Sequence, residues 1–472
     1  MLGYADMTNR ISRRALLGST LAPLMAAAAK PARLPNIIWF MYDDLGSGGL
    51  GCYGQEKMST PHSDRVAREG TRFTACYAGG SVCAPSRSVL MSGLHLGHAP
   101  VRANAQTVPL RPEDVTVAEV LKSAGYATGH FGKWGLGDAG STGAPTRQGF
   151  DEFYGYLHQT QAHNYWPEYL RDGEAKDPLP ANVGRKKGTY SAPLIARRAE
   201  QFVDKHAAAG RPFFLYASPT LPHALFHPPD DRPYSDRAGW TKRQRDYAAM
   251  VTDADAHLGR ILALLDQHSV ADNTIVFVTS DNGGPKEPDG EFFETNRGLR
   301  GYKGSLNEGG LRVPMLVRWP GRVAAGKVDA TPWYFADLLP TAAAVAGAKA
   351  PRGVDGVSML PVLTGKAKLK RRALYWEQSR WDAKTGLLRE DTTLAQAVRL
   401  GDWKAIRSAP GAALELYDLA RDPREERNAA AANPKAVAEI DAVLRAAHVA
   451  ARPHNNGNPE WVGRKDIPPS ED

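Results

Sequence analysis

The chain has 472 residues, of which 42% are hydrophobic and 23% charged, as is typical of a globular protein large enough for two domains. Three cysteines are too few for a fold that depends on disulfides, and the sequence does not say whether Cys52 and Cys76 pair. The net charge of +8 favours anionic partners, but scattered basic residues and an export signal argue against nucleic acid.

Residues 1–29 have the pattern of an export signal. Arg13 and Arg14 precede an apolar run over residues 15–29, which is too short to span a bilayer comfortably and ends in small residues suited to cleavage. The paired arginines resemble a twin-arginine signal, and a Sec signal or a short anchor is the alternative. We therefore expect an exported protein, periplasmic or extracellular, that meets the membrane only transiently during export.

Apolar runs that predict buried strands alternate with helical patterns along the first three quarters of the chain. The predicted strands are residues 36–42, 212–217, 274–279 and 314–319, and the predicted helices are residues 63–69, 115–124, 191–206, 244–267 and 334–346. This alternation predicts an α/β fold with a mostly parallel central sheet flanked by helices. Ligands of such sheets bind at the carboxyl ends of the strands.

A region rich in Gly, Pro and Lys, residues 347–370, predicts a domain boundary. Beyond it, short strand patterns and one helical pattern predict a smaller α+β subdomain: residues 373–377, 395–400, 403–406, 415–419 and 434–449. We expect a catalytic domain at 33–365, and the C-terminal subdomain with a polar tail at 366–472.

Oxygen-bearing side chains follow two of the predicted strands. Asp43 and Asp44 end the first, and Asp281 and Asn282 end the third. Glycines after Asp44 allow the adjacent carboxylates to converge, and such an oxygen set suits Ca²⁺ or Mg²⁺ better than zinc. Taken singly, each pair is also compatible with a helix cap or a turn.

The segment Cys83-Ala84-Pro85-Ser86-Arg87 places a small nucleophile near the start of a helix predicted at residues 86–94. Arg87 follows about one turn later, and free backbone N–H groups at a helix start attract anions. This arrangement suits attack on a tetrahedral oxyanion ester. A buried cysteine beside a proline-started helix is the alternative interpretation.

These motifs occur with several others in one chain, and together they resemble the type I sulfatases of the alkaline phosphatase-like superfamily. The resemblance covers about residues 36–428. Its further motifs are Gly132-Lys133-Trp134-Gly135-Leu136-Gly137, Pro222-His223, Gly301-Tyr302-Lys303-Gly304, the run 308–314, Leu416-Tyr417-Asp418-Leu419, Asp422-Pro423 and Asn428.

The resemblance implies a set of roles. A formylglycine-generating enzyme would oxidise Cys83 to formylglycine, whose hydrated aldehyde is the family's nucleophile. One Ca²⁺ would be bound by the side chains of Asp43, Asp44, Asp281, Asn282 and residue 83. The family's remaining catalytic positions correspond to Arg87, which would hold the formylglycine, Lys133 and Lys303, which would grip sulfate oxygens, and His223, which would protonate the departing alcohol.

The chain departs from the family pattern at Gly135, where the family usually has a histidine that is thought to assist the second half of the reaction. His130, His158 and His163 are the candidates to replace it. We favour His163, because residues 159–166 (QTQAHNYW) form a polar, aromatic segment typical of a binding loop. The alternatives are that His163 only contacts substrate, or that nothing replaces the missing group.

The segment 97–104 follows the nucleophile helix, and its His98 and Arg102 are candidates for lining the pocket, although a structural loop is equally compatible. We expect a sulfatase that acts on sulfate esters, on a carbohydrate. The alternatives are a phosphatase or phosphonate monoester hydrolase of the same superfamily, and a catalytically silent glycan-binding relative. The retained cysteine, arginine, lysines and histidine argue against a silent protein.

Overall fold

The computed structural model describes residues 33–104, 108–286, 290–382 and 387–452. The predicted export signal at 1–29 and the predicted tail at 453–472 lie outside the described residues. Among the helices of the described ranges, none is both long enough and apolar enough to cross a membrane. Cys52, Cys76 and Cys83 are all free thiols.

The main sheet has eleven strands in the order β10-β2-β9-β8-β1-β7-β3-β4-β5-β6, with β11 also pairing with β2. Its strands are β1 Asn36–Tyr42, β2 Thr71–Tyr77, β3 Ala127–Lys133, β4 Glu152–Tyr156, β5 Tyr169–Asp172, β6 Ala175–Pro178, β7 Phe213–Ser218, β8 Thr274–Ser280, β9 Arg312–Arg318, β10 Lys327–Asp329 and β11 Trp333–Tyr334. The central pairings are parallel, whereas β9 runs antiparallel to both β8 and β2. The predicted α/β class with a mostly parallel central sheet is confirmed.

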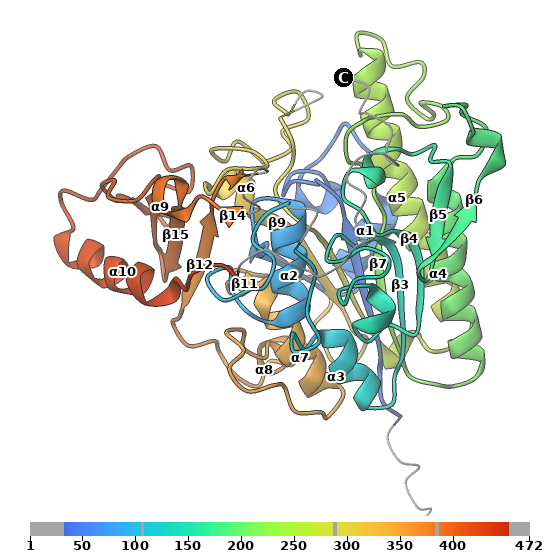
Figure 1. Ribbon diagram of the computed structural model, residues 1–472, viewed down its shortest axis with the longest axis horizontal. Helices are drawn as coiled ribbons and strands as arrows, with labels where there is room; N and C mark the ends of the chain where they lie inside the picture. Colours follow the sequence, from blue (N-terminus) through green and yellow to red (C-terminus); the bar gives the residue numbers. More distant parts are fainter. Residues whose placement is uncertain (1–32, 105–107, 287–289, 383–386, 453–472) are drawn as a thin grey trace, which may run out of the picture. The chain divides into compact units, whose positions relative to one another are not determined.

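Helices cover both faces of this sheet, because β1 is apolar at every position from 37 to 41 and its side chains alternate between the faces. Ile37, Trp39 and Met41 share a core with α2 (Cys83–Ser92), α3 (Val117–Ser123) and α7 (Leu338–Val345). Ile38 and Phe40 share the other core with α1 (Pro61–Arg68), α4 (Ser191–Ala208) and α5 (Lys242–Gln267). Figure 1 shows the two helical layers on either side of the sheet.

A second, antiparallel sheet follows the main one in the chain. Its order is β12-β15-β16-β17, with bounds Ala373–Gln378, Ala395–Leu400, Trp403–Arg407 and Glu415–Asp418. Helix α10 (Pro434–Ala447) packs on one face through Ile440 and Leu444, and Trp376 on the other face joins the main core. The short elements are α6 (Glu308–Leu311), α8 (Leu360–Leu363), α9 (Glu390–Thr393) and the β13–β14 hairpin (Trp381–Asp382 with Leu387–Leu388). The division at residue 366 stays a prediction.

Every strand and helix that the sequence predicts is present, with ends shifted by up to a few residues. The helix at the nucleophile candidate, α2, begins earlier than predicted, at Cys83. It ends at Ser92 and is capped by Gly93, which adopts φ 71°. The strands β2, β3 and β4 escaped the sequence analysis. In β3, small residues replace a continuous apolar run, and Gly129 lies against the ring of Phe202 in place of a side chain of its own.

Candidate active site

The predicted acidic residues meet at the carboxyl ends of two neighbouring parallel strands. Tyr42 of β1 is in register with Ser280 of β8, so the residues that follow each strand leave the sheet side by side. The Asp44 backbone N–H donates to Asp281 Oδ1 at 3.0 Å, and Asn282 Nδ2 donates to Asp44 Oδ1 at 2.8 Å. All these side chains are buried. The sheet thus concentrates three carboxylates and an amide in one place.

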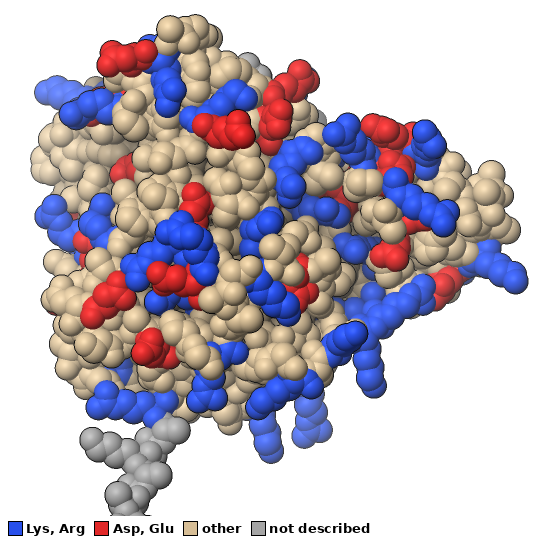
Figure 2. All heavy atoms as spheres, turned by 180° about the vertical axis from the view of Figure 1, so that it is seen from behind, with Lys and Arg blue, Asp and Glu red and all other residues tan. Residues whose placement is uncertain are grey.

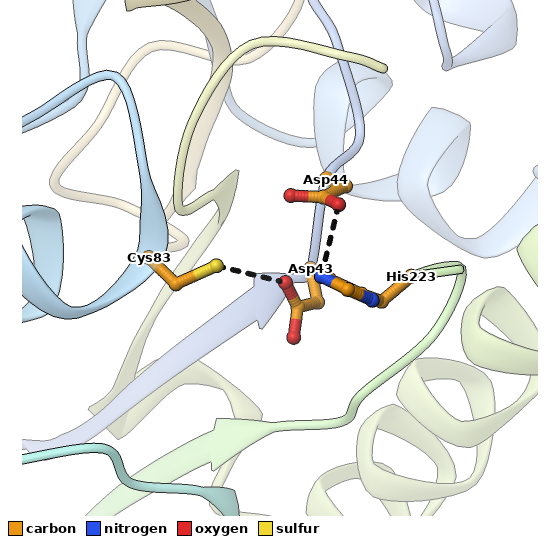
Figure 3. A group of neighbouring side chains, drawn as sticks. All are labelled: Asp43, Asp44, Cys83 and His223. Carbon is orange, nitrogen blue, oxygen red and sulfur yellow. Dashed lines mark hydrogen bonds and ion pairs between the residues drawn. The ribbon is translucent and has the colours of Figure 1, made fainter. Parts of the chain in front are cut away.

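Cys83 stands at the first position of α2 and points at this acidic group (Figure 3). Its Sγ lies 3.9 Å from Asp43 Oδ1 and 3.3 Å from Lys133 Nζ. Burial raises the pKa of the Cys83 thiol to about 11, although the charges of Lys133 and Lys303 act in the opposite direction. The residue is therefore a neutral thiol at pH 7, and a poor nucleophile in that form.

Arg87 lies one helical turn beyond Cys83 and clamps the strand ends to α2. Its Nη2 is 2.8 Å from Asp281 Oδ2 and 3.5 Å from Asp43 Oδ2, and its Nη1 donates to the Lys133 carbonyl at 2.5 Å. The side chain is fully buried. Burial alone would lower the pKa of Arg87, but nearby Tyr216 and the two carboxylates raise it above its ordinary value. The guanidinium therefore stays charged.

Two lysines complete the charge balance of the site. Lys133, the last residue of β3, lies 2.8 Å from Asp43 Oδ2, and Lys303 lies 2.7 Å from Asp44 Oδ2. Burial raises the pKa of each carboxyl, yet the surrounding positive charges outweigh it and lower both below the ordinary value. Asp43 and Asp44 are therefore ionised, and cations face them from two directions.

His223 follows β7 and faces Asp44 and Lys303. Its Nε2 lies 2.9 Å from Lys303 Nζ and 3.3 Å from Asp44 Oδ2, and its Nδ1 contacts the carbonyl of Ala224. The Lys303 ammonium can only donate, so these partners assign the proton of the neutral ring to Nδ1 and leave Nε2 as the acceptor. Burial lowers the pKa of His223, which keeps the ring neutral at pH 7.

The site also offers an orphaned oxygen. Asn282 Oδ1 is buried and has no hydrogen-bond partner within the described part of the chain, although its Nδ2 is paired. Ligand atoms of Asp43, Asp44, Cys83 and His223 all lie within 4.8 Å of one another. An unpaired amide oxygen beside ionised carboxylates is the donor set that a hard cation prefers, so these residues fit Ca²⁺.

The structure does not bring all predicted residues into this cluster. His98 Nδ1 lies 3.0 Å from Asp355 Oδ2, and Arg102 Nη1 lies 3.0 Å from Glu377 Oε1. His163 does join the site, because its ring stacks on His223 with centroids 4.2 Å apart. Burial lowers the pKa of His163 to about 2, and nearby His223 and the charges of the two lysines act in the same direction.

His130 and His158 lie elsewhere. The His130 ring stacks on Tyr216 with centroids 4.5 Å apart, and its Nε2 is 2.9 Å from Ser218 Oγ. His158 Nδ1 accepts a hydrogen bond from the Thr160 N–H at 3.1 Å. Of these three histidines, His163 alone contacts His223 within the described part of the chain.

Gly135 adopts φ +81°, and a Cβ on it would lie 1.8 Å from Gln159 Nε2. Gln159 thus occupies the space that the side chain of a larger residue at position 135 would need. Both polar atoms of its amide are buried and have no partner among the residues that the structure describes. A residue that the sequence analysis missed is Tyr165, whose hydroxyl lies 2.8 Å from the Thr220 carbonyl and 2.7 Å from that of His223. Its place in the polar, aromatic segment was the available signal.

Taken together, fold and geometry define a hydrolase site for a tetrahedral oxyanion ester, in which cations surround a buried position at the end of a doubly wound sheet. Comparisons with known families agree. The family model "Sulfatase" matches residues 35–348, and the model "N-sulphoglucosamine sulphohydrolase, C-terminal" matches residues 302–451.

Individual proteins agree with the family match. Human arylsulfatase A is 34% identical over 455 residues, covering 86% of this chain and 85% of its own length. Dog N-acetylgalactosamine-6-sulfatase is 32% identical, covering 83% and 75%. The crystal structure of Ps i-CgsB in complex with k-i-k-neocarrahexaose superposes with a TM-score of 0.77 at 28% identity, covering 92% of this chain and 98% of that one. The chain belongs to the sulfatase family, whose members are sulfuric ester hydrolases with the alkaline phosphatase-like fold.

Proposed function

We propose that this sulfuric ester hydrolase removes sulfate from a carbohydrate, using a formylglycine made from Cys83 and one Ca²⁺ held by Asp43, Asp44, Asp281, Asn282 and residue 83. The observation that carries the proposal is the position of Cys83, which heads α2 between Asp43 and Lys133. A thiol with a pKa of about 11 is a weak nucleophile at neutral pH, which supports its conversion by a maturation enzyme.

The modified residue and the cation would supply a hydrated aldehyde as nucleophile and positive charge that offsets the negative charge of sulfate. Lys133 and Lys303 flank the same position and stay protonated, so each can donate to a sulfate oxygen. The Arg87 guanidinium already donates hydrogen bonds to Asp281 and to the Lys133 carbonyl. Its part is to fix the strand ends and residue 83 in place.

His223 is the group that would protonate the departing alcohol. Its Nε2 accepts a hydrogen bond from Lys303, which orients the ring. An anionic ester bound beside it would raise the pKa of His223, so that the ring could carry the proton that it gives to the leaving oxygen. His163 stacks on the same ring and adds a neutral, polarisable neighbour. An anionic ester bound between these cations would raise the pKa of His163, which is what its role as a base requires.

A saccharide is the substrate class that we favour. The similar protein Ps i-CgsB was solved in complex with k-i-k-neocarrahexaose. In this chain, the segment that carries His163 also presents Trp166, which is partly buried, and Gln159, whose amide lacks partners among the described residues. An aromatic face together with unpaired amide groups suits a sugar ring with its hydroxyls.

The test compares hydrolysis of an aryl sulfate with that of the matched aryl phosphate, and then screens sulfated saccharides. We expect kcat/KM to favour the sulfate, and Cys83→Ala to abolish turnover. Cys52→Ala is the matched control, because Cys52 is a free thiol outside the site. Mass spectrometry of the peptide with residue 83 should find formylglycine. Preference for phosphate, or full activity with an unmodified Cys83, would refute the proposal.

A further inference from the structure

A groove with a cavity volume of about 910 Å³ lies away from the residues of the candidate active site. Three segments line it: residues 327–332 at β10, residues 362–374 between α8 and β12, and residues 399–402 at the β15–β16 turn. None of the lining residues belongs to the candidate catalytic or metal set. A volume in the range of about 300–1,000 Å³ is typical of sites for organic ligands.

The lining of this groove is strongly basic. It includes seven lysines and arginines against two aspartates, and one of these, Asp329, is already paired with Lys327 at 2.8 Å. Figure 2 shows Lys and Arg side chains gathered along the lower right of the view, with few acidic side chains among them. The groove therefore carries positive charge that the surrounding protein does not neutralise.

Lys366, Lys368 and Lys370 are the source of this excess. All three are exposed, and the described residues contain no acidic partner for any of them. They alternate along a segment without regular secondary structure, in which Leu369 packs against the main core. Because neighbours in an extended chain point to opposite sides, the inward Leu369 turns Lys368 and Lys370 outward.

The end of the same segment is anchored. Arg371 lies 2.8 Å from Glu439 of α10, and Arg372 is paired with Asp337 through both of its terminal nitrogens. These ion pairs tie the end of the segment to elements on both sides, so the backbone that carries the three lysines is anchored there. Cations on an anchored backbone bind an anionic chain at a lower entropic cost than a flexible tail does.

We propose that this groove binds a stretch of sulfated polysaccharide and thereby holds a long substrate while the active site acts on another part of the same chain. The inference rests on the proposed function. The groove is concave, so an extended, flexible polyanion can enter it, whereas a flat bilayer would touch only its rim. The alternating lysines favour repeated single anionic groups, because a lysine ammonium acts as a point charge.

The experiment compares two full-length variants of equal charge change. Lys366→Glu/Lys368→Glu/Lys370→Glu reverses the row, and Arg185→Glu/Lys186→Glu/Lys187→Glu reverses three exposed cations outside the groove. Binding of dextran sulfate is measured, with neutral dextran as the uncharged probe. We expect about a tenfold or larger loss of dextran sulfate affinity in the groove variant and less than about threefold in the control.

Turnover of a small and of a long substrate distinguishes a failure of this inference from a failure of the proposed function. Both variants should hydrolyse a small aryl sulfate as the unmodified protein does, while the groove variant alone should show a raised KM on a long sulfated polysaccharide. An equal loss of dextran sulfate binding in the two variants would overturn the proposal, because net charge alone would then explain it. Tighter binding of duplex DNA or of phosphatidylserine vesicles than of dextran sulfate would also overturn it. Absence of aryl sulfate hydrolysis in all three proteins would instead count against the proposed function.

Discussion

A buried ion cluster joins the C-terminal sheet to the loop that carries Lys303, and removing its central cation should destabilise the protein. Lys404 of β16 is fully buried, and its Nζ lies 3.0 Å from Glu308 Oε1 and 3.0 Å from Glu425 Oε1. Only the contact with Glu308 has hydrogen-bond geometry. Glu308 begins α6, shortly after Lys303, and its N–H donates to Glu425 Oε2 at 2.8 Å.

Lys404→Met keeps the length of the side chain and removes its charge. Breaking a buried ion pair by removing one partner costs about 3–5 kcal/mol, because the remaining charge is left without compensation. Arg312 still contacts Glu308 at 2.5 Å, so we expect the lower end of this range, about 3 kcal/mol. For a chain of this size that is a fall in Tm of roughly 3 °C.

The pH dependence of folding stability tests the same ion cluster independently. Burial raises the pKa of Glu308, but Arg312 and Lys404 outweigh it and lower the value from 4.5 to about 2. A depressed carboxyl pKa contributes stability that is present above pH 4.5 and is lost as the pH falls toward 2. Without Lys404 the pKa of Glu308 rises, so the acid-induced loss should be smaller in the variant than in the unmodified protein.

Thermal unfolding at neutral and acidic pH measures both effects, and aryl sulfate turnover reports on the Lys303 loop. Lys435→Met is the control, because Lys435 is exposed on α10 and should change stability by less than about 0.5 kcal/mol. Lys404→Met/Glu425→Gln should recover part of the loss, since it removes one uncompensated charge. Equal melting of Lys404→Met and the control would refute the reasoning.

Three further predictions concern the metal, His163 and His448. Chelation should abolish turnover and Ca²⁺ should restore it, with about one hard cation per chain found by metal analysis; tightly bound zinc would contradict the assignment. His163→Ala should slow aryl sulfate turnover by about 10²–10⁴-fold if the residue is a base, but mainly raise KM on glycans if it binds sugar; pre-steady-state kinetics separates the two. The hydrogen bond to Glu377 raises the pKa of His448. The stabilisation that protonated His448 provides is therefore complete below pH 6.5 and is lost as the pH rises through the raised pKa. His448→Ala should make thermal stability less dependent on pH above 6.5.

The acidic half of the site could be predicted because it depends on local sequence and on one rule of sheet architecture. β1 and β8 are short apolar runs that end directly in Asp43-Asp44 and Asp281-Asn282, and the ends of parallel strands lie at the same edge. The sequence does not reveal which strands are neighbours. The order β8-β1-β7-β3 is what brings Lys133 to Asp43, and β3 itself has too little apolar character to be recognised.

Arg102 illustrates why the remaining site residues could not be assigned from the sequence. It follows the nucleophile helix closely in the chain, which made it a candidate for lining the pocket. In the structure it hydrogen-bonds to Glu377, which lies 275 positions away on β12, and to the carbonyl of Val449. A buried arginine finds its partners through the packing of two sheets, and no spacing in the sequence encodes that contact.

The absence of a histidine at position 135 is coupled to the presence of Gln159. A side chain at Gly135 would be strained at φ +81° and would meet the Gln159 amide, so a histidine there requires Gln159 to change as well. A buried amide without partners costs about 1–3 kcal/mol, which a ligand that pairs with it recovers. An amide binds and orients but accepts no proton at neutral pH, so Gln159 can replace the space of a histidine without replacing its basicity. Under our proposal, proton transfer would then fall to a ring next to His223, and His163 is the histidine stacked there.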